Sequence, residues 1–308
     1  MRIFITGGTG LVGSHLVKKL CGRGDHAVVL SRRAEAAKDL AGENCTVVVG
    51  DPVQPGPWMD AMVDCDAVVH LAGEGIFNRR WSSEFKELIL SSRVKSTQNI
   101  AAALAKQPRN ATGQPKAFVS GSAIGYYGPH ADEELSEVSL AGNDFLASVC
   151  CAWEAAAQGA MAQGVRVVLL RTGIVLAGSG GPLTKMLTPF KMFVGGPIAG
   201  GAQFMSWIHI DDEVGLILHA LDHPEISGPL NATAPNPVSN RAFSTTLGKV
   251  LGRPSFLPTP GFALRVMLGE GAQIITTGQR VLPRKAIASG YEFKFTELEP
   301  ALKDLLAK

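Results

Sequence analysis

The sequence predicts an α/β protein built on a doubly wound parallel sheet. Short apolar segments with strand character alternate with segments of helical spacing over most of the 308 residues, an alternation typical of parallel sheets covered by helices. The first apolar segment ends in a glycine cluster that leads into a helix. A serine and two tyrosines follow the fifth apolar segment, at the end of a strand where open parallel sheets place their ligands.

The glycine cluster predicts a dinucleotide site. It lies between an expected strand at 2–5 and an expected helix at 11–22, and it fits both G-x-G-x-x-G and T-G-x-x-G-x-x-G. Glycine permits positive φ in the turn, lets the backbone approach a pyrophosphate and lets the helix seat closely on the strand. Free N–H groups at the start of the helix then face the phosphates. The predicted contacts are Gly7, Thr9, Gly10, Leu11, Val12 and Gly13.

The residues after the second expected strand, 26–30, favour NADP(H) over NAD(H). NAD sites usually carry an acid here, which holds the ribose 2′-hydroxyl. This chain has Ser31, Arg32 and Arg33 instead, and a hydroxyl with guanidinium groups binds a 2′-phosphate through charge-assisted hydrogen bonds. The alternative is that the arginines form only a solvated strand end.

The third and fourth expected strands supply further predicted contacts. Asp51 closes the strand at 47–49, either as an adenine contact or as an ordinary loop residue. The strand at 67–70 ends in Leu71, Ala72 and Gly73, small enough for a cofactor to pass close to the backbone. Helical spacing at 81–106 places Arg93 facing that path.

The second half of the chain carries the candidate catalytic residues. A fifth strand at 115–120 leads into Ser122, Tyr126 and Tyr127. We then expect a helix at 144–163, a sixth strand at 165–171, a glycine-dense covering segment with a helix at 183–193, and a helix up to residue 221 capped by Asp211 or Asp212. A short strand at 230–232, a helix at 240–251, an extended piece at 254–260 and helical pieces at 280–285 and 297–306 complete the chain.

Composition bounds the remaining possibilities. Hydrophobic residues make up 46% and charged residues 18%, and the formal net charge of +2 with no basic run predicts no nucleic-acid partner. Five cysteines without a C-x-x-C pair predict reduced thiols and no metal site. We see neither a membrane-spanning run nor a targeting segment. We therefore expect a cytoplasmic protein, a monomer or homodimer, that acts on a small molecule.

Several segments together resemble the extended and atypical short-chain dehydrogenase/reductases, the group that contains the nucleotide-sugar epimerases. The likeness is closest to the branch called epimerase family proteins, which share a C-terminal domain of unknown function. The resemblance implies a Rossmann-type sheet with NADP(H) along its C-terminal edge, and it makes Arg93 and the backbone near Val175 cofactor contacts. Glu74, which follows Leu71, Ala72 and Gly73, is a further predicted contact. The segments that carry the resemblance are 6–13, 31–32, 70–74, 81, 92–93, 122–128, 153–154, 207–212, 278–283 and 290–291.

The resemblance also implies that different parts of the chain bind the cofactor and the substrate. Residues 1–177, completed by 205–235, are expected to form the NADP-binding domain. Residues 178–204 and 236–308 are expected to form a smaller substrate-binding region. The substrate pocket would then lie between the sheet and the C-terminal part.

One departure from the family pattern leaves two functions open. Most short-chain dehydrogenases carry Tyr-x-x-x-Lys after the serine strand, but Leu146 and Cys150 occupy those two positions here. In the first interpretation the protein is an NADP(H)-dependent oxidoreductase or epimerase, acting on a carbonyl, hydroxyl or nucleotide-sugar substrate, in which Ser122 polarises the substrate and Tyr126 or Tyr127 replaces the lost acid. In the second it binds NADP(H) without turnover and reports redox state to a partner.

Overall fold

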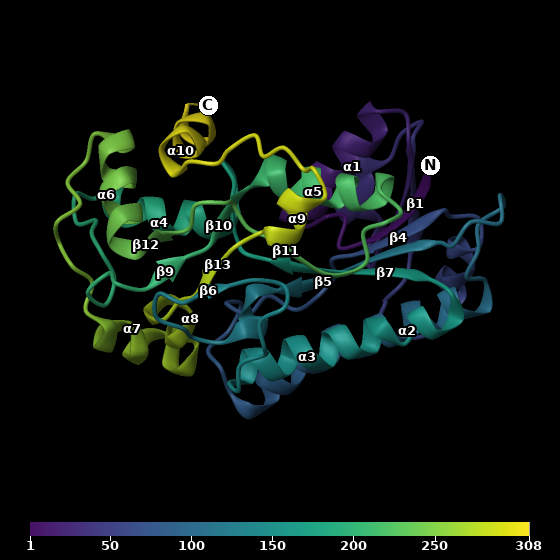
Figure 1. Ribbon diagram of the computed structural model, residues 1–308, viewed down its shortest axis with the longest axis horizontal. Coiled ribbons are helices and arrows are strands. Elements are labelled where there is room, and N and C mark those ends of the chain that lie inside the picture. Colours follow the sequence, from purple (N-terminus) through teal and green to yellow (C-terminus); the bar gives the residue numbers. More distant parts are fainter. Residues whose placement is uncertain (308) are drawn as a thin grey trace.

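The computed structural model describes residues 1–307 and is centred on a sheet of seven parallel strands (Figure 1). The strand order is β11-β7-β5-β4-β1-β2-β3, so the winding reverses between β1 and β4. This confirms the predicted doubly wound sheet. The strands are β1 (Arg2–Thr6), β2 (His26–Ser31), β3 (Cys45–Val49), β4 (Ala67–His70), β5 (Ala117–Ala123), β7 (Arg166–Thr172) and β11 (Gly228–Ala232).

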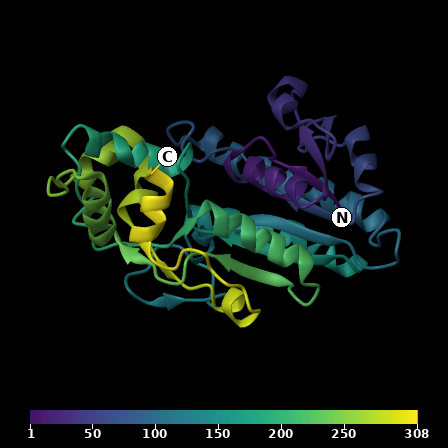
Figure 2. The same cartoon turned by 90° about the horizontal axis from the view of Figure 1, so that it is seen from above.

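Two pairs of helices cover the faces of the sheet. α1 and α5 pack together on one face, and α2 and α3 pack together on the other (Figures 1 and 2). Successive side chains along each strand point to opposite faces of the sheet, so the strands contribute to the hydrophobic clusters on both faces. In β1, Ile3 and Ile5 join the cluster under α1 and α5, whereas Phe4 joins the cluster under α2. The helices are α1 (Leu11–Gly22), α2 (Ser83–Lys106), α3 (Phe145–Gln158) and α5 (Ile210–Asp222).

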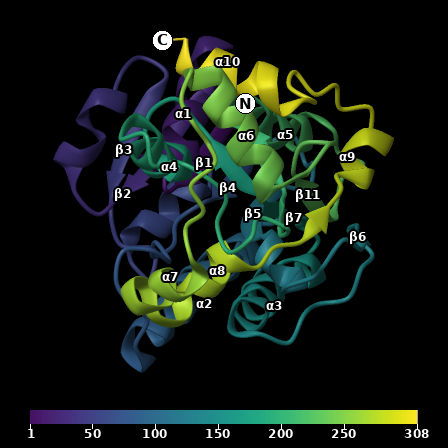
Figure 3. The same ribbon diagram turned by 90° about the vertical axis from the view of Figure 1, so that its left-hand side faces the viewer.

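A smaller set of elements lies beyond one end of the sheet, and Figure 3 looks onto it. β8 (Ile174–Leu176) pairs with β10 (Trp207–His209), β9 (Phe204–Met205) with β12 (Val238–Ser239), and β6 (Glu134–Leu135) with β13 (Arg280–Val281). The remaining helices are α4 (Gly181–Lys191), α6 (Asn240–Leu251), α7 (Gly261–Leu268), α8 (Gln273–Thr276), α9 (Arg284–Ala288) and α10 (Leu298–Leu306). Short 3₁₀ turns are η1 (Ala34–Leu40), η2 (Pro57–Met62), η3 (Ile124–Tyr127), η4 (Met161–Gln163) and η5 (Gly269–Ala272).

Two predictions about local structure are wrong. Residues 280–285 do not begin a helix, because Arg280 and Val281 pair with Glu134 and Leu135, a partner far away in the sequence. The N-cap of α5 is His209, whose Nδ1 accepts from the backbone N–H of Asp211 at 3.0 Å. The carboxylate of Asp212 accepts instead from the backbone N–H groups of Lys294 and Phe295, which ties the C-terminal segment to α5.

Helix termini elsewhere follow their caps. α2 begins at Ser83 rather than at 81, because the Ser82 hydroxyl accepts from the backbone N–H of Phe85 at 3.2 Å. α3 stops at Gln158, and the predicted continuation to 163 is the separate turn η4. Within residues 1–307, no helix combines the length and the apolar character needed to cross a membrane.

Candidate cofactor and substrate site

The turn from Gly7 to Gly13 joins β1 to α1 at the C-terminal edge of the sheet. Gly7 has a φ of +73°, which an L side chain adopts only at a cost, and its carbonyl accepts from the N–H of Gly10 at 2.9 Å. A Cβ on Gly13 would lie 2.2 Å from the Gly7 oxygen and 2.7 Å from the Gly8 Cα. The close seating of helix on turn therefore requires glycine at position 13.

The N-terminus of α1 is open to a ligand. Its N-cap is Gly10, which has no side chain to satisfy the first N–H groups of the helix. Thr9 and Gly10 are exposed, and Leu11 and Val12 are half-buried. Unsatisfied backbone donors at a helix start form an anion site, so this end of α1 has the chemistry that a pyrophosphate needs.

The residues at the ends of β2 and β3 lie at the same edge of the sheet, because the two strands are parallel neighbours. Arg32 is exposed, and its guanidinium has no hydrogen-bond or ion-pair partner in the part of the chain that is described. Ser31 is buried, and its hydroxyl donates to the Arg33 carbonyl at 2.8 Å and accepts from the Arg33 backbone N–H at 3.3 Å. Asp51 is exposed and accepts from the backbone N–H of Val53 at 3.0 Å, as a turn residue does. Its adenine contact stays a prediction.

A buried polar chain fixes the end of β4 against β1. The Ala72 N–H donates to Thr6 Oγ1 at 3.3 Å, and Thr6 Oγ1 lies 2.5 Å from His70 Nδ1. His70 Nε2 lies 3.0 Å from the hydroxyl of Ser96, which itself donates to Ser92. Burial lowers the pKa of His70 to about 3, so the ring is neutral and can accept at Nδ1 while donating from Nε2. We did not predict this network from the sequence.

Arg93 reaches from α2 to the segment after β4. Its Nη2 donates to the Glu74 carbonyl and its Nη1 to the Ile89 carbonyl, both at 2.9 Å. Its Cζ lies 5.2 Å from the centroid of the Trp153 ring. Burial lowers the pKa of Arg93, and no carboxylate forms an ion pair with it within residues 1–307. A half-buried cation without a counter-ion suits an anionic or electron-rich ligand.

A buried ion pair lies next to Ser122. Arg171 binds Glu154 in bidentate fashion, with Nε–Oε1 at 2.8 Å and Nη2–Oε2 at 2.9 Å. Burial alone would lower the pKa of Arg171, but the hydrogen bonds to Glu154 outweigh it and raise the pKa. The Ser122 hydroxyl donates to Glu154 Oε1 at 2.7 Å. Its proton therefore points at the carboxylate and not at the cavity described below.

The two candidate tyrosines belong to the same network. The Tyr127 hydroxyl donates to Asn231 Oδ1 at 2.7 Å and accepts from Arg171 Nη1 at 3.0 Å. The residue is completely buried, and burial raises the pKa of its phenol to about 12. Tyr126 is half-buried, with the Arg171 Cζ 3.4 Å from its ring centroid. Neither tyrosine is among the residues that line the cavity.

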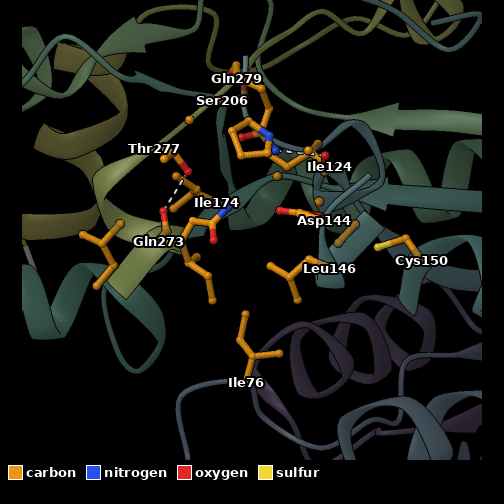
Figure 4. A pocket seen from close by; sticks show the side chains of 18 of the residues that line it. Ile76, Ile124, Asp144, Leu146, Cys150, Ile174, Ser206, Gln273, Thr277 and Gln279 are labelled. Carbon is orange, nitrogen blue, oxygen red and sulfur yellow. Dashed lines mark hydrogen bonds between the residues drawn. The ribbon is translucent and has the colours of Figure 1, made fainter. Parts of the chain in front are cut away.

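A cavity of about 500 Å³ lies between the C-terminal edge of the sheet and the smaller region. Figure 4 shows Leu146 of α3 across from Gln273 of α8, with the Cys150 sulfur at the edge of the cavity. Burial raises the pKa of the Cys150 thiol to about 12. The two positions that carry the Tyr and Lys of the usual dyad thus offer the cavity an alkyl chain and a protonated thiol.

Glu213 of α5 carries a buried carboxyl next to the cavity wall. Its Oε1 accepts from Thr172 Oγ1 at 2.8 Å, and its Oε2 has no partner in the described part of the chain. Thr172 itself lines the cavity. Burial raises the pKa of Glu213 from 4.5 to about 8, because the charged form would lose its hydration without gaining a counter-ion.

We expect Glu213→Gln to remove a pH-dependent part of the stability. The raised pKa means that the wild-type contribution is fully present below about pH 4.5 and is lost as the pH rises through about 8. The wild-type minus variant difference in unfolding free energy should therefore fall by a few kcal/mol across this window. Urea unfolding at a series of pH values measures it, and a flat difference would show that the carboxyl titrates normally.

No group of three or more histidine, cysteine or acidic side chains within residues 1–307 is arranged to hold a metal ion.

Comparisons with known proteins place this geometry in a family. Residues 3–232 match the model of the NAD dependent epimerase/dehydratase family, which is more than half of the chain. The chain belongs to this family. Residues 259–305 match a further model, a domain of unknown function called DUF1731. The resemblance inferred from the sequence is confirmed.

Relatives cover the whole chain. The Epimerase family protein YfhF of Bacillus subtilis is 39% identical, with 100% of this chain and 98% of that protein covered. The chloroplastic Epimerase family protein SDR39U1 homolog of Arabidopsis thaliana is 41% identical over 99% of this chain and 87% of its own length. The crystal structure of the human epimerase family protein SDR39U1 with NADPH is 36% identical, with a TM-score of 0.85 and coverage of 100% and 99%. As a member of this family, the chain has the Rossmann-like, NAD(P)-binding type of fold. Its cytoplasmic location stays a prediction.

Proposed function

We propose that this epimerase-family protein binds NADP(H) along the C-terminal edge of the sheet and exchanges hydride with a substrate in the cavity. The observation that carries the proposal is the glycine turn, because a Cβ at Gly13 finds no room and the N–H groups of α1 lack a cap. The human relative, a structure with NADPH, supports the choice of cofactor. When bound, the nicotinamide supplies or accepts the hydride.

The proposed cofactor contacts follow the path from α1 to the cavity. Backbone donors at the start of α1 would hold the pyrophosphate, and Ser31 and Arg32 would hold the 2′-phosphate. Arg93 and Val175 line the cavity itself, where they would border the nicotinamide end. The other proposed contacts are Gly7, Thr9, Gly10, Leu11, Val12, Gly13, Asp51, Leu71, Ala72, Gly73 and Glu74. We further propose that 1–177 with 205–235 bind the cofactor, and that 178–204 with 236–308 bind the substrate.

Replacing Arg32 by alanine should weaken NADPH binding by roughly 10- to 100-fold and leave NADH binding nearly unchanged. A charge-assisted hydrogen bond to the 2′-phosphate is worth about 1.5–3 kcal/mol, and NADH has no such group. Fluorescence titration with both cofactors measures the effect. Lys38→Ala is the control, because Lys38 lies exposed in the turn η1 that follows β2 and its ammonium forms an ion pair with Glu35. Equal losses for both cofactors would show that Arg32 does not read the phosphate.

The candidate catalytic residues take positioning roles in this proposal. The Ser122 hydroxyl is hydrogen-bonded to Glu154, and Glu154 is paired with Arg171. Arg171 and Asn231 are both hydrogen-bonded to the Tyr127 hydroxyl. Together they would fix the floor of the cavity beside the nicotinamide rather than exchange a proton with substrate. Asp144 lines the cavity and uses Oδ1 to cap α3 at the Ala147 N–H, so its second oxygen is available as a proton acceptor.

A second function, NADP(H) binding without turnover, is favoured by one observation: Leu146 and Cys150 offer no acid or base at neutral pH. Deuterium-labelled NADPH separates the two functions. Incubation with a panel of carbonyl compounds, followed by mass spectrometry, should show the label in a product if hydride is transferred. Tight cofactor binding with no labelled product from any class would favour the binding function.

A further inference from the structure

The cavity is lined mainly by hydrocarbon. Apolar side chains reach it from the loop after β4, from α3 and α4, and from the C-terminal region that the family model leaves as a domain of unknown function. Its size of about 500 Å³ lies within the range of small-molecule sites. Among the apolar lining residues are Ile76, Phe145, Leu146, Met186, Phe204 and Ile274.

The charges around the cavity do not suit a diphosphate. Its lining contains three charged side chains, Arg93, Asp144 and Glu270, so carboxylates outnumber cations. Arg93 is engaged with the carbonyls of Glu74 and Ile89 and lies on the proposed cofactor path. Glu270 is paired with Lys86. A nucleoside-diphosphate sugar inside the cavity would bring two further negative charges to a lining whose one described cation, Arg93, is already engaged, and such groups are bound by arginine or lysine.

The mouth of the cavity combines large apolar side chains with the exposed Arg79 and Arg80, which line the outer hollow but not the cavity itself. A smaller hollow of about 200 Å³ adjoins it and shares Ile76, Phe77 and Trp81 with it. Met267 of α7 lines this hollow and is 71% exposed, and Phe77 is 39% exposed. Exposed large apolar side chains at the rim of a pocket are typical of sites through which apolar ligands enter.

A few polar groups could orient a ligand inside. Gln273 is an exposed residue at the edge of the cavity, its side chain points toward the cavity (Figure 4), and that side chain makes no hydrogen bond within residues 1–307. By contrast, the amide of Gln279 is already used, donating to the Ile124 carbonyl at 2.9 Å. An apolar pocket with one or two free polar groups is typical of sites that bind an uncharged molecule with a single carbonyl or hydroxyl.

We propose that the cavity takes an uncharged, largely apolar substrate with one carbonyl or hydroxyl group, such as an isoprenoid or other branched alcohol or aldehyde, and excludes nucleoside-diphosphate sugars. This inference rests on the proposed function, in which the nicotinamide occupies the end of the cavity near Arg93 and Val175. Gln273 would hold the substrate oxygen, and Leu146, Met186 and Ile274 would surround the hydrocarbon.

Calorimetry on the full chain saturated with NADPH tests this proposal. Geraniol is the probe, because NADPH cannot reduce an alcohol and binding is read without turnover. UDP-glucose is the charged comparison. We expect geraniol to bind and UDP-glucose to bind at least about tenfold more weakly. UDP-glucose binding as tightly as geraniol, or better, would overturn the proposal.

Two variants locate the binding. Ile274→Lys places a charge in the cavity and should weaken geraniol by about tenfold or more while leaving NADPH affinity unchanged. Ile287→Lys is the matched control, because Ile287 is 51% exposed on α9 and does not line the cavity. If geraniol affinity survives Ile274→Lys, the proposal is wrong. NADPH fluorescence measures cofactor binding separately. If NADPH does not bind, the proposed function is wrong. Titration of geraniol into the cofactor-free chain then still shows whether the cavity binds an apolar alcohol.

Discussion

Alanine at Gly13 is expected to lower NADPH affinity by about a hundredfold or more, equivalent to nearly 3 kcal/mol. The added Cβ would lie 2.2 Å from the Gly7 carbonyl oxygen, and that neighbour is backbone rather than a side chain that can turn away. The turn must therefore shift, and the N–H groups at the start of α1 leave the positions that a pyrophosphate needs. Fluorescence titration of NADPH measures the loss.

Gly22→Ala provides the control for this experiment. Gly22 is the last residue of the same helix, and a Cβ there meets nothing within 4 Å. Alanine is a better helix former than glycine by about 0.5–1 kcal/mol, so this variant should bind NADPH normally and be slightly more stable. Normal affinity in both variants would show that the glycine turn does not hold the cofactor.

The largest expected effect on stability comes from Arg171→Met. This change removes the cation and leaves the Glu154 carboxylate buried, with only the Ser122 hydroxyl as partner. Removing one member of a buried ion pair costs about 3–5 kcal/mol, because the remaining charge keeps its desolvation penalty. Tyr127 also loses a hydrogen-bond donor. Urea unfolding followed by circular dichroism should show a lower midpoint.

An exposed ion pair supplies the comparison. Lys249 and Glu299 join α6 to α10 with an N–O distance of 2.8 Å, and the Lys249 side chain is 68% exposed. Lys249→Ala should change the unfolding free energy by about 0–1 kcal/mol. The double variant Arg171→Met with Glu154→Leu should recover part of the loss, since it removes both charges. If Arg171→Met costs no more than Lys249→Ala, the buried network contributes little to the fold.

The parts that could be predicted from the sequence depend on neighbours along the chain. Most strands of the central sheet are short apolar runs, and Gly13 lies within a few residues of the Gly7 and Gly8 backbone that requires it. The family resemblance added the position of Arg93, which the structure places on the cavity wall. Local pattern was sufficient for the strands and the turn, and the resemblance supported the placement of Arg93.

Predictions that depended on distant partners were less successful. Arg280 and Val281 form a strand because Glu134 and Leu135 lie beside them, which no local spacing reveals. Asp212 has the character of a helix cap, yet its carboxylate binds the backbone of Lys294 and Phe295. A polar side chain satisfies whichever donors the fold brings within reach, and those donors are set by packing.

The sequence by itself determined the alternation of strands and helices, the glycine turn, and the absence of the Tyr-x-x-x-Lys pair from positions 146 and 150. Each of these features depends on residues that lie close together in the sequence. Only the tertiary structure decided that the Ser122 proton serves Glu154, that the Tyr127 hydroxyl is enclosed by Asn231 and Arg171, and that the cavity wall is hydrocarbon. Burial and hydrogen-bond partners decide what a serine or a tyrosine can do, and both arise when segments a hundred residues apart come into contact.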